Sequence, residues 1–154
     1  MEKPTEVRQV IVTRTLDATP QVAFEDWIYS NKLCRWWGPK DFTNPVCTVH
    51  AHPGGAMLVH MQAPDGTIHL MKGLFHEVRQ PERIVLTTYA MDDHDHPVLE
   101  VLNTITFTPQ EDKTLIKVRA EVLNAKPEGV QFMAGMKQGW TESLDRLAAL
   151  NTKL

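Results

Sequence analysis

Cysteine is scarce in this sequence, and several other signals are missing altogether. The two cysteines, Cys34 and Cys47, have no CxxC spacing, which excludes a disulfide-dense scaffold and favours free thiols in a reducing cytosol. No stretch approaches the roughly 20 apolar residues that span a bilayer, and the polar N-terminus lacks the apolar core of a secretory signal. We therefore predict a cytoplasmic protein without a membrane span.

Charge of one sign and catalytic motifs are also lacking. The net charge is only −3, which gives no electrostatic footprint for nucleic acid or an anionic membrane surface. The sequence contains no GxSxG elbow, no phosphate-binding loop and no dinucleotide fingerprint. We accordingly predict no catalytic residue, no cofactor and no nucleic-acid partner.

Histidines are present, but their spacing does not favour a metal site. His94 and His96 lie among aspartates in a polar stretch that ends at Pro97, without the rigid spacing of ligands on a helix. This stretch is predicted to be a solvated loop, and no metal ligand is proposed. His60 and His69 are predicted to lie on the outward face of a hairpin.

The composition that remains is that of an ordinary globular protein. The 154 residues are 42% hydrophobic and 23% charged, and no linker or repeat divides them. We expect a single domain over residues 1–154, in which residues 1–7 form a disordered or loosely attached tail.

Two helices are predicted after a first strand at residues 8–16. Thr19 is a suitable N-cap and Pro20 a suitable first residue for the first helix. A second short helix should begin at Ser30 or Asn31 and continue to residue 37, because Gly38 and Pro39 stop it.

Alternating apolar residues predict six further strands and a long last helix. The turns between the strands are short, which indicates an antiparallel meander, and Asp65-Gly66 is the strongest hairpin signal. Apolar residues at steps of three or four predict one helix over residues 128–150. The strands are expected at residues 46–51, 56–62, 67–78, 84–91, 99–108 and 114–122.

Several short motifs occur in an order that resembles a known family. They are Asp17-Ala18-Thr19-Pro20, Arg35-Trp36-Trp37-Gly38-Pro39, Pro53-Gly54-Gly55, Pro64-Asp65-Gly66, Pro81-Glu82-Arg83-Ile84-Val85, and Gly135 to Trp140 followed by Leu144-Asp145-Arg146-Leu147. The chain resembles the SRPBCC (START-like, birch-pollen-allergen-like) helix-grip superfamily, in its branch related to the C-terminal domain of the activator of the ninety-kilodalton heat-shock protein ATPase. The resemblance implies an α+β fold in which about seven antiparallel strands curve around the C-terminal helix and enclose a cavity.

The cavity that this resemblance implies should be lined by inward-facing apolar residues. Alternation across the Asp65-Gly66 turn places Ile68 and Leu70 on the same concave face as Met57, Val59 and Met61. A plainly filled core is the alternative for most of these positions. The predicted ligand-binding residues are Trp27, Trp36, Phe42, Met57, Val59, Met61, Leu70, Leu86, Thr88, Asn103, Ile105, Met133, Met136 and Trp140.

Asn103 is the most informative polar position. It falls on the inward parity of an apolar strand, where it either bonds to backbone or buried water or orients a ligand. The loop over residues 38–45, which contains Phe42, is the predicted gate.

Three functions remain open at this point. The first is a carrier or sensor that binds a small hydrophobic molecule. The second is a cyclase- or dehydratase-like enzyme acting on a polyketide or aromatic substrate. The third is a chaperone-associated interaction domain, and a homodimer is compatible with each.

Overall fold

The computed structural model describes residues 8–151, so the predicted tail at residues 1–7 lies outside the described part. Twelve elements follow one another in this range. They are β1 (Gln9–Leu16), α1 (Pro20–Ile28), α2 (Ser30–Leu33), β2 (Thr43–Val49), β3 (Ala56–Gln62), β4 (Ile68–Arg79), β5 (Arg83–Met91), β6 (Pro97–Gln110), β7 (Lys113–Ala125), the 3₁₀ turn η1 (Pro127–Gly129), α3 (Val130–Ala134) and α4 (Met136–Leu150).

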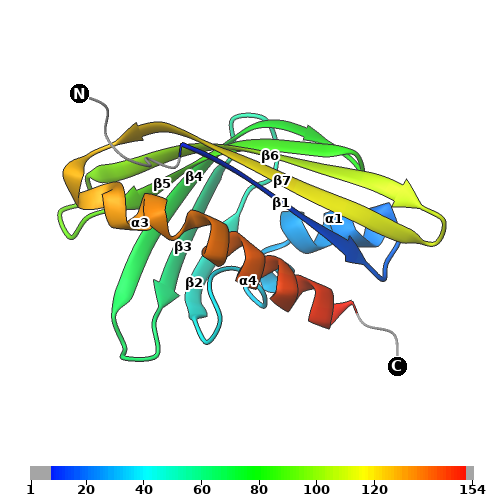
Figure 1. The fold of residues 1–154 in the computed structure, drawn as a ribbon, viewed down its shortest axis with the longest axis horizontal. Coiled ribbons are helices and arrows are strands. Elements are labelled where there is room, and N and C mark those ends of the chain that lie inside the picture. The colour runs from blue at the N-terminus through cyan, green and yellow to red at the C-terminus, as the bar shows by residue number, and fades with distance from the viewer. Residues whose placement is uncertain (1–7, 152–154) are drawn as a thin grey trace.

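The seven strands form one antiparallel sheet that curves around α4 (Figure 1). Their order is β1-β7-β6-β5-β4-β3-β2, so the meander from β2 to β7 is continued by β1, which pairs with the last strand. The two short helices follow β1 and lie on the same side of the sheet as α4 (Figure 1). The predicted α+β helix-grip fold is confirmed.

Local chemistry explains the first two helices, and one of them is shorter than predicted. Thr19 accepts a hydrogen bond from the backbone N–H of Val22 at 3.4 Å, and Pro20 is the first residue of α1. However, α2 ends at Leu33 rather than at residue 37. The chain continues as tight turns because the buried Trp36 ring reaches back to α1, where its indole N–H donates to the carbonyl of Asp26 at 3.0 Å.

The prediction of one continuous C-terminal helix is wrong. The segment is divided into η1, α3 and α4, and the break between the two helices falls at Gly135. The Gly135 N–H is shared between the carbonyls of Gln131 and Phe132, both at 3.2 Å, so the helix tightens there. Glycine favours such a break because it weakens a helix by about 1 kcal/mol relative to alanine.

The prediction of which β4 side chains face inward is also wrong, because the pairing of β4 with β3 differs by one residue from the predicted register. The hairpin loop has three residues rather than two, because Ala63 N–H donates to the carbonyl of Thr67 at 2.9 Å and Gly66 adopts a positive φ of 91°. Met61 therefore pairs with His69, and every side chain of β4 changes face. The concave side carries His69 and Met71, whereas Ile68 and Leu70 belong to the outward parity.

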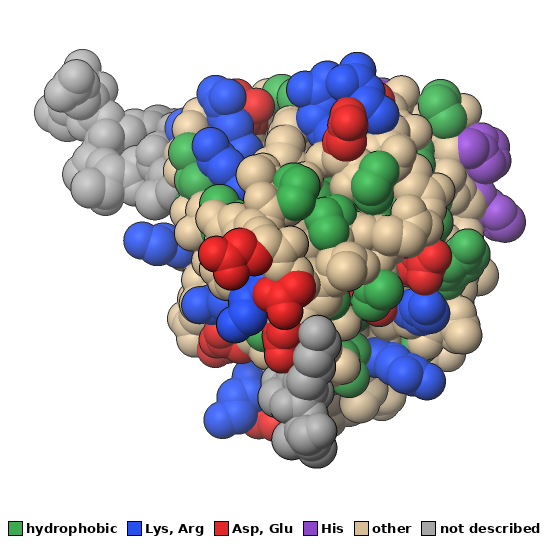
Figure 2. Space-filling view, turned by 90° about the vertical axis from the view of Figure 1, so that its right-hand side faces the viewer, with side chains coloured by type: hydrophobic (Ala, Val, Ile, Leu, Met, Phe, Trp, Pro, Cys, Tyr) green, Lys and Arg blue, Asp and Glu red, His purple; other side chains and the backbone are tan. Residues whose placement is uncertain are grey.

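Large side chains fill the half of the concave side nearest α1 and α2, which we call the filled end. Phe24, Trp27, Trp36, Phe107 and Leu144 are all at most 4% exposed there. The Trp27 and Trp36 ring centroids are 4.6 Å apart, and those of Phe24 and Phe107 are 5.1 Å apart. From the side nearest α1 and the β6–β7 turn, hydrophobic side chains appear only in small separate groups among charged side chains, other side chains and backbone (Figure 2). The apolar bulk of this end is therefore internal.

Candidate ligand-binding cavity

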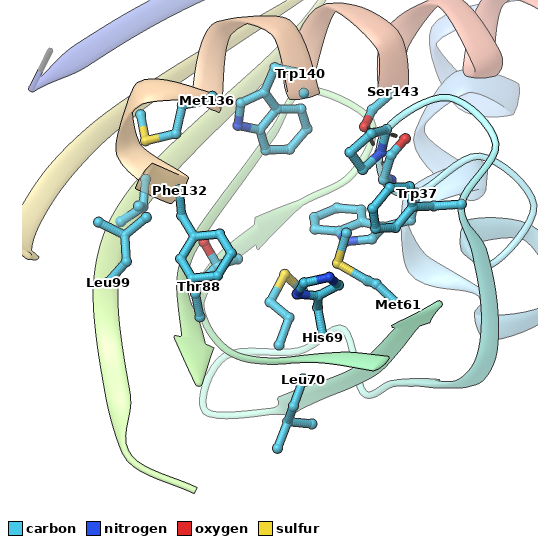
Figure 3. Close-up of a pocket in the computed structure, with 18 of the residues that line it drawn as sticks. Trp37, Met61, His69, Leu70, Thr88, Leu99, Phe132, Met136, Trp140 and Ser143 are labelled. Atoms are coloured by element: carbon cyan, nitrogen blue, oxygen red, sulfur yellow. Dashed lines mark hydrogen bonds between the residues drawn. The ribbon is translucent and has the colours of Figure 1, made fainter. Parts of the chain in front are cut away.

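A cavity of about 330 Å³ occupies the other half of the concave side, which we call the hollow end. It lies between the sheet, α3 and the first half of α4 (Figure 3). A volume in this range can hold a small molecule. Its lining residues are Trp37, Gly38, Pro39, Phe42, Met61, His69, Leu70, Met71, Thr88, Ala90, Met91, Leu99, Val101, Asn103, Gln131, Phe132, Gly135, Met136, Gly139, Trp140 and Ser143.

Half of the predicted ligand-binding residues line this cavity. They are Phe42, Met61, Leu70, Thr88, Asn103, Met136 and Trp140. Leu70 does so only at the rim, since Figure 3 shows it pointing away from the other labelled side chains. Its place on the inner wall is taken by His69, which the sequence had assigned to the convex surface.

The other predicted residues pack into the core and do not line the cavity. They are Trp27, Trp36, Met57, Val59, Leu86, Ile105 and Met133. Their inward orientation was predicted, but each lies along its strand or helix where neighbouring side chains already fill the space. Alternation along a strand gives the face of a residue and not the depth of the space above it.

Small residues explain why this end is hollow. On β5, Leu86 and Ile84 fill the core, whereas Thr88 and Ala90 continue the same face with less volume. On α4, Gly139 faces the cavity, and a Cβ atom built on it would meet no heavy atom within 4 Å. The sheet and helix thus run on into a region where their side chains are too short to meet.

Three rings surround the outer part of the cavity, and we call them the aromatic mouth. The His69 ring lies 5.9 Å from Phe42 and 6.2 Å from Phe132, measured between ring centroids. These residues come from β4, the loop before β2 and α3, so three separate elements meet there (Figure 3). His69 is the one titratable side chain among the lining residues.

The loop before β2, which was the predicted gate, is hydrogen-bonded to α4. Ser143 donates its hydroxyl proton to the carbonyl of Gly38 at 3.0 Å and accepts from the Gly38 N–H at 3.1 Å. The Arg146 guanidinium donates to the carbonyls of Arg35, Trp37, Gly38 and Pro39 at 3.0–3.2 Å. This part of the loop is therefore a fixed wall, and residues 43–45 of the predicted gate belong to β2.

The ionisation of two α4 side chains reflects this attachment. Burial lowers the pKa of Arg146, an effect that the nearby Asp41 carboxylate opposes. The Gln138 side chain and the Lys40 N–H both donate to Glu142, and these bonds lower the pKa of its carboxyl. These bonds thus favour the charged form of Glu142, whereas burial opposes the charge of Arg146, which a guanidinium nevertheless keeps at neutral pH.

Asn103 is buried and faces inward, as predicted. Its Nδ2 donates to the Thr88 hydroxyl at 3.0 Å, to the Val101 carbonyl at 3.2 Å and to the Leu86 carbonyl at 3.3 Å. Its Oδ1 is buried without a hydrogen-bond partner among residues 8–151. Asn103, which lines the cavity, therefore has one acceptor atom without a partner in the described part of the chain.

Between residues 8 and 151 there is no cluster of metal-ligating side chains, and no carboxylate lines the cavity. Within residues 8–151, no group of three or more histidine, cysteine, aspartate or glutamate side chains is placed to hold a metal ion. Both cysteines are free, and burial raises the pKa of the Cys47 thiol to about 11, which keeps it protonated. Glu77 forms an ion pair with Arg83 at 3.0 Å, and Asp26 accepts a hydrogen bond from Asn151. Neither carboxylate lines the cavity.

The curved sheet, the helix that it grips and the apolar cavity between them define a protein of the SRPBCC helix-grip class. The family model described as "Activator of Hsp90 ATPase homolog 1-like protein" matches residues 17–151, and the chain belongs to this family. No protein with a curated description matches the chain. Over residues 8–151, no helix has both the length and the apolar character needed to cross a membrane.

Solved structures of bacterial proteins share the fold over almost the whole chain. A protein from Chromobacterium violaceum is 27% identical with a TM-score of 0.80, and the match covers 96% of this chain and 99% of that one. A protein from Arthrobacter aurescens is 22% identical with a TM-score of 0.83, covering 96% and 88%. The AHSA1 protein from Silicibacter pomeroyi is 22% identical with a TM-score of 0.78, covering 92% and 95%.

Proposed function

We propose that this protein binds a small, mostly apolar molecule in the hollow end and acts as its carrier or sensor. The observation that carries the proposal is the contrast in size along one face, from the crowded Trp27 and Phe107 to the short Thr88, Ala90 and Gly139. An empty apolar space costs stability, because its walls lack contact partners. A space kept open between well-filled walls favours an occupant.

Burial of apolar surface would supply most of the binding free energy, at about 25 cal/mol per Å² removed from water. The lining is apolar apart from a few groups, which suits a ligand of the same character. Entry is expected at the aromatic mouth, since α3 is short and joined to α4 through Gly135, whereas the loop on the other side is bonded to α4. Phe132 would then move aside with α3.

A dye titration tests the proposal. An environment-sensitive apolar dye should bind with one-to-one stoichiometry and be displaced by one class of apolar compound, such as fatty acids, sterols or aromatic polyketides. The variant Met61→Trp places a large ring in the cavity and should weaken dye binding at least tenfold. His60→Trp is the matched control, because it adds the same ring on the outward face of the same strand. Equal dye binding by all three proteins would contradict the proposal.

An enzyme acting on an aromatic or polyketide-like substrate is the second candidate, and His69 is the observation that favours it. An imidazole at the mouth of an apolar cavity is a suitable general base when it lies within hydrogen-bond reach of the substrate. Turnover of a bound compound that His69→Gln abolishes, while binding is retained, would establish catalysis.

A chaperone-associated role is the third candidate, and it derives from the name of the family. Exposed hydrophobic residues such as Ile11, Leu74 and Leu123 occur on the outward face of the sheet. A stable complex with a ninety-kilodalton heat-shock protein, broken by Leu74→Glu and not by Met61→Trp, would favour this role over the cavity.

A further inference from the structure

The polar groups of the cavity wall give a further indication of what the ligand carries, on the assumption that the proposed function is right. Ser143 already donates to one atom of Gly38 and accepts from another, so its hydroxyl is committed. His69 belongs to the aromatic mouth, and Gln131 is an exposed residue of α3 at the outer side of the cavity. Thr88 and Asn103 are then the polar side chains of the inner wall.

The orientation of the Asn103 amide is fixed by its surroundings. Its nitrogen faces two backbone carbonyls, those of Leu86 and Val101, which can only accept hydrogen bonds. The opposite orientation would set three oxygens against one another. Oδ1 is therefore the amide atom that points away from these two carbonyls, and it has no hydrogen-bond partner among the described residues.

The same reasoning fixes the role of Thr88. Its hydroxyl oxygen accepts a hydrogen bond from Asn103 at 3.0 Å, so its own proton is free to be donated elsewhere. The neighbouring pair thus offers the ligand one donor, the Thr88 hydroxyl, and one acceptor, Asn103 Oδ1.

Asn103 Oδ1 differs in its location from the other buried polar atoms that lack a hydrogen-bond partner. Four buried side-chain polar atoms have no hydrogen-bond partner in the described residues, and they belong to Arg14, Trp27, Asn44 and Asn103. Only Asn103 also lines the cavity. A buried acceptor without a partner destabilises a protein, so an occupant that donates to it gains affinity that apolar contact alone cannot give.

We propose that the ligand carries a hydroxyl group at its buried end, whose oxygen accepts from Thr88 and whose proton is donated to Asn103 Oδ1. A hydroxyl is the smallest group that both donates and accepts through one atom. The rest of the ligand is apolar, in keeping with the remaining walls. The ligand class is therefore a small alcohol or phenol with an apolar skeleton.

Three naphthalenes that differ in one group test this inference by displacement of the dye from the full chain. Naphthol has a hydroxyl, methoxynaphthalene keeps the oxygen without the proton, and methylnaphthalene has neither. Hydrogen bonding to both residues predicts that naphthol binds about tenfold more tightly than methylnaphthalene, with methoxynaphthalene between them. Hydrophobic burial alone predicts the reverse order, because naphthol is the least apolar of the three.

Two variants and a control assign the effect to the named groups. Asn103→Leu and Thr88→Val should each reduce naphthol affinity about tenfold and leave methylnaphthalene affinity within about twofold. Thr88→Val preserves the shape of the side chain, so it remains informative if Asn103→Leu does not fold. Thr104→Val, on the outward face of β6, makes the same chemical change away from the cavity and should alter nothing.

The outcomes separate this inference from the proposed function. Naphthalenes that bind in order of hydrophobicity, with Asn103→Leu and Thr88→Val unchanged, would overturn the hydroxyl inference and leave the carrier proposal intact; a trapped water satisfying both groups would give this result. If none of the three displaces the dye, and Met61→Trp does not affect dye binding, the proposed function itself fails.

Discussion

The filled end and the hollow end are built on the same three elements, β5, β6 and α4, yet one is crowded and the other open. Towards the filled end these elements carry Leu86, Ile105 and Leu144, and α1 and α2 add further rings above them. Towards the hollow end Thr88 and Gly139 occupy equivalent faces, and no residue of α1 or α2 lines the cavity. The same sheet and helix thus provide stability at one end and space at the other, through the size of their side chains and the position of the inserted helices.

The largest expected effect comes from removing a ring at the filled end. Phe107→Ala should lower the free energy of unfolding by about 3–5 kcal/mol, because it leaves a cavity between Phe24 and Trp27. Phe42→Ala, the same change at the aromatic mouth, should cost less than about 1 kcal/mol, because that ring is partly exposed. Urea denaturation measures both values, and equal losses would remove the distinction between the two ends.

The next effect concerns the boundary between the ends, where Arg146 holds the loop that carries Trp37. Arg146→Met should lower the free energy of unfolding by about 2 kcal/mol, since it leaves several backbone carbonyls without their charged donor. Dye affinity should fall as well, because the loop forms one wall of the cavity. Retention of both properties, measured by urea denaturation and dye titration, would show that the wall does not depend on the guanidinium.

A smaller effect concerns Asp26, a partly buried carboxyl group on α1. Burial raises the pKa of Asp26 above its usual value of 3.8, and the Asn151 hydrogen bond only partly opposes this. The folded state therefore binds the Asp26 proton more tightly than the unfolded state does, and this contribution to stability is lost as pH rises through the folded pKa.

Asp26→Asn should accordingly raise the melting temperature slightly at pH ~7, and the gain should vanish as pH falls towards the unfolded pKa. The introduced amide oxygen can still accept from Asn151. Thermal melts of both proteins across this range test the sign. A variant that is less stable than wild type at every pH would contradict it.

Much of this architecture could be predicted from the sequence, and the failures have physical causes. Alternation placed Asn103 and Thr88 on the inner face correctly. The error at His69 and Leu70 arose from one residue in a hairpin loop: the face was counted across a two-residue Asp65-Gly66 turn, whereas the bond from the Ala63 N–H to the Thr67 carbonyl closes a loop of three residues. Side-chain period is exactly two, so a single miscounted residue reverses a whole strand.

The extent of the cavity could not be predicted in the same way. A Cβ atom at Gly139 would meet no heavy atom within 4 Å, and that space depends on how the whole sheet lies relative to α4, which the local sequence does not give. Trp36 and Trp37 are neighbours in the sequence, but Trp36 is buried in the filled end and Trp37 lines the cavity. Their division depends on where α2 ends, which helix signals alone placed four residues too late.

Filling the hollow end from the helix tests the central claim most directly. Gly139→Leu should make the free protein more stable by about 1 kcal/mol, since it replaces a helical glycine and its side chain enters unoccupied space. Thermal melts of wild type and variant, each with and without saturating dye, report both properties at once. The account predicts a higher melting temperature for the variant alone and the loss of the dye-induced increase. A variant that is less stable than wild type, or that is still stabilised by the dye, would contradict it.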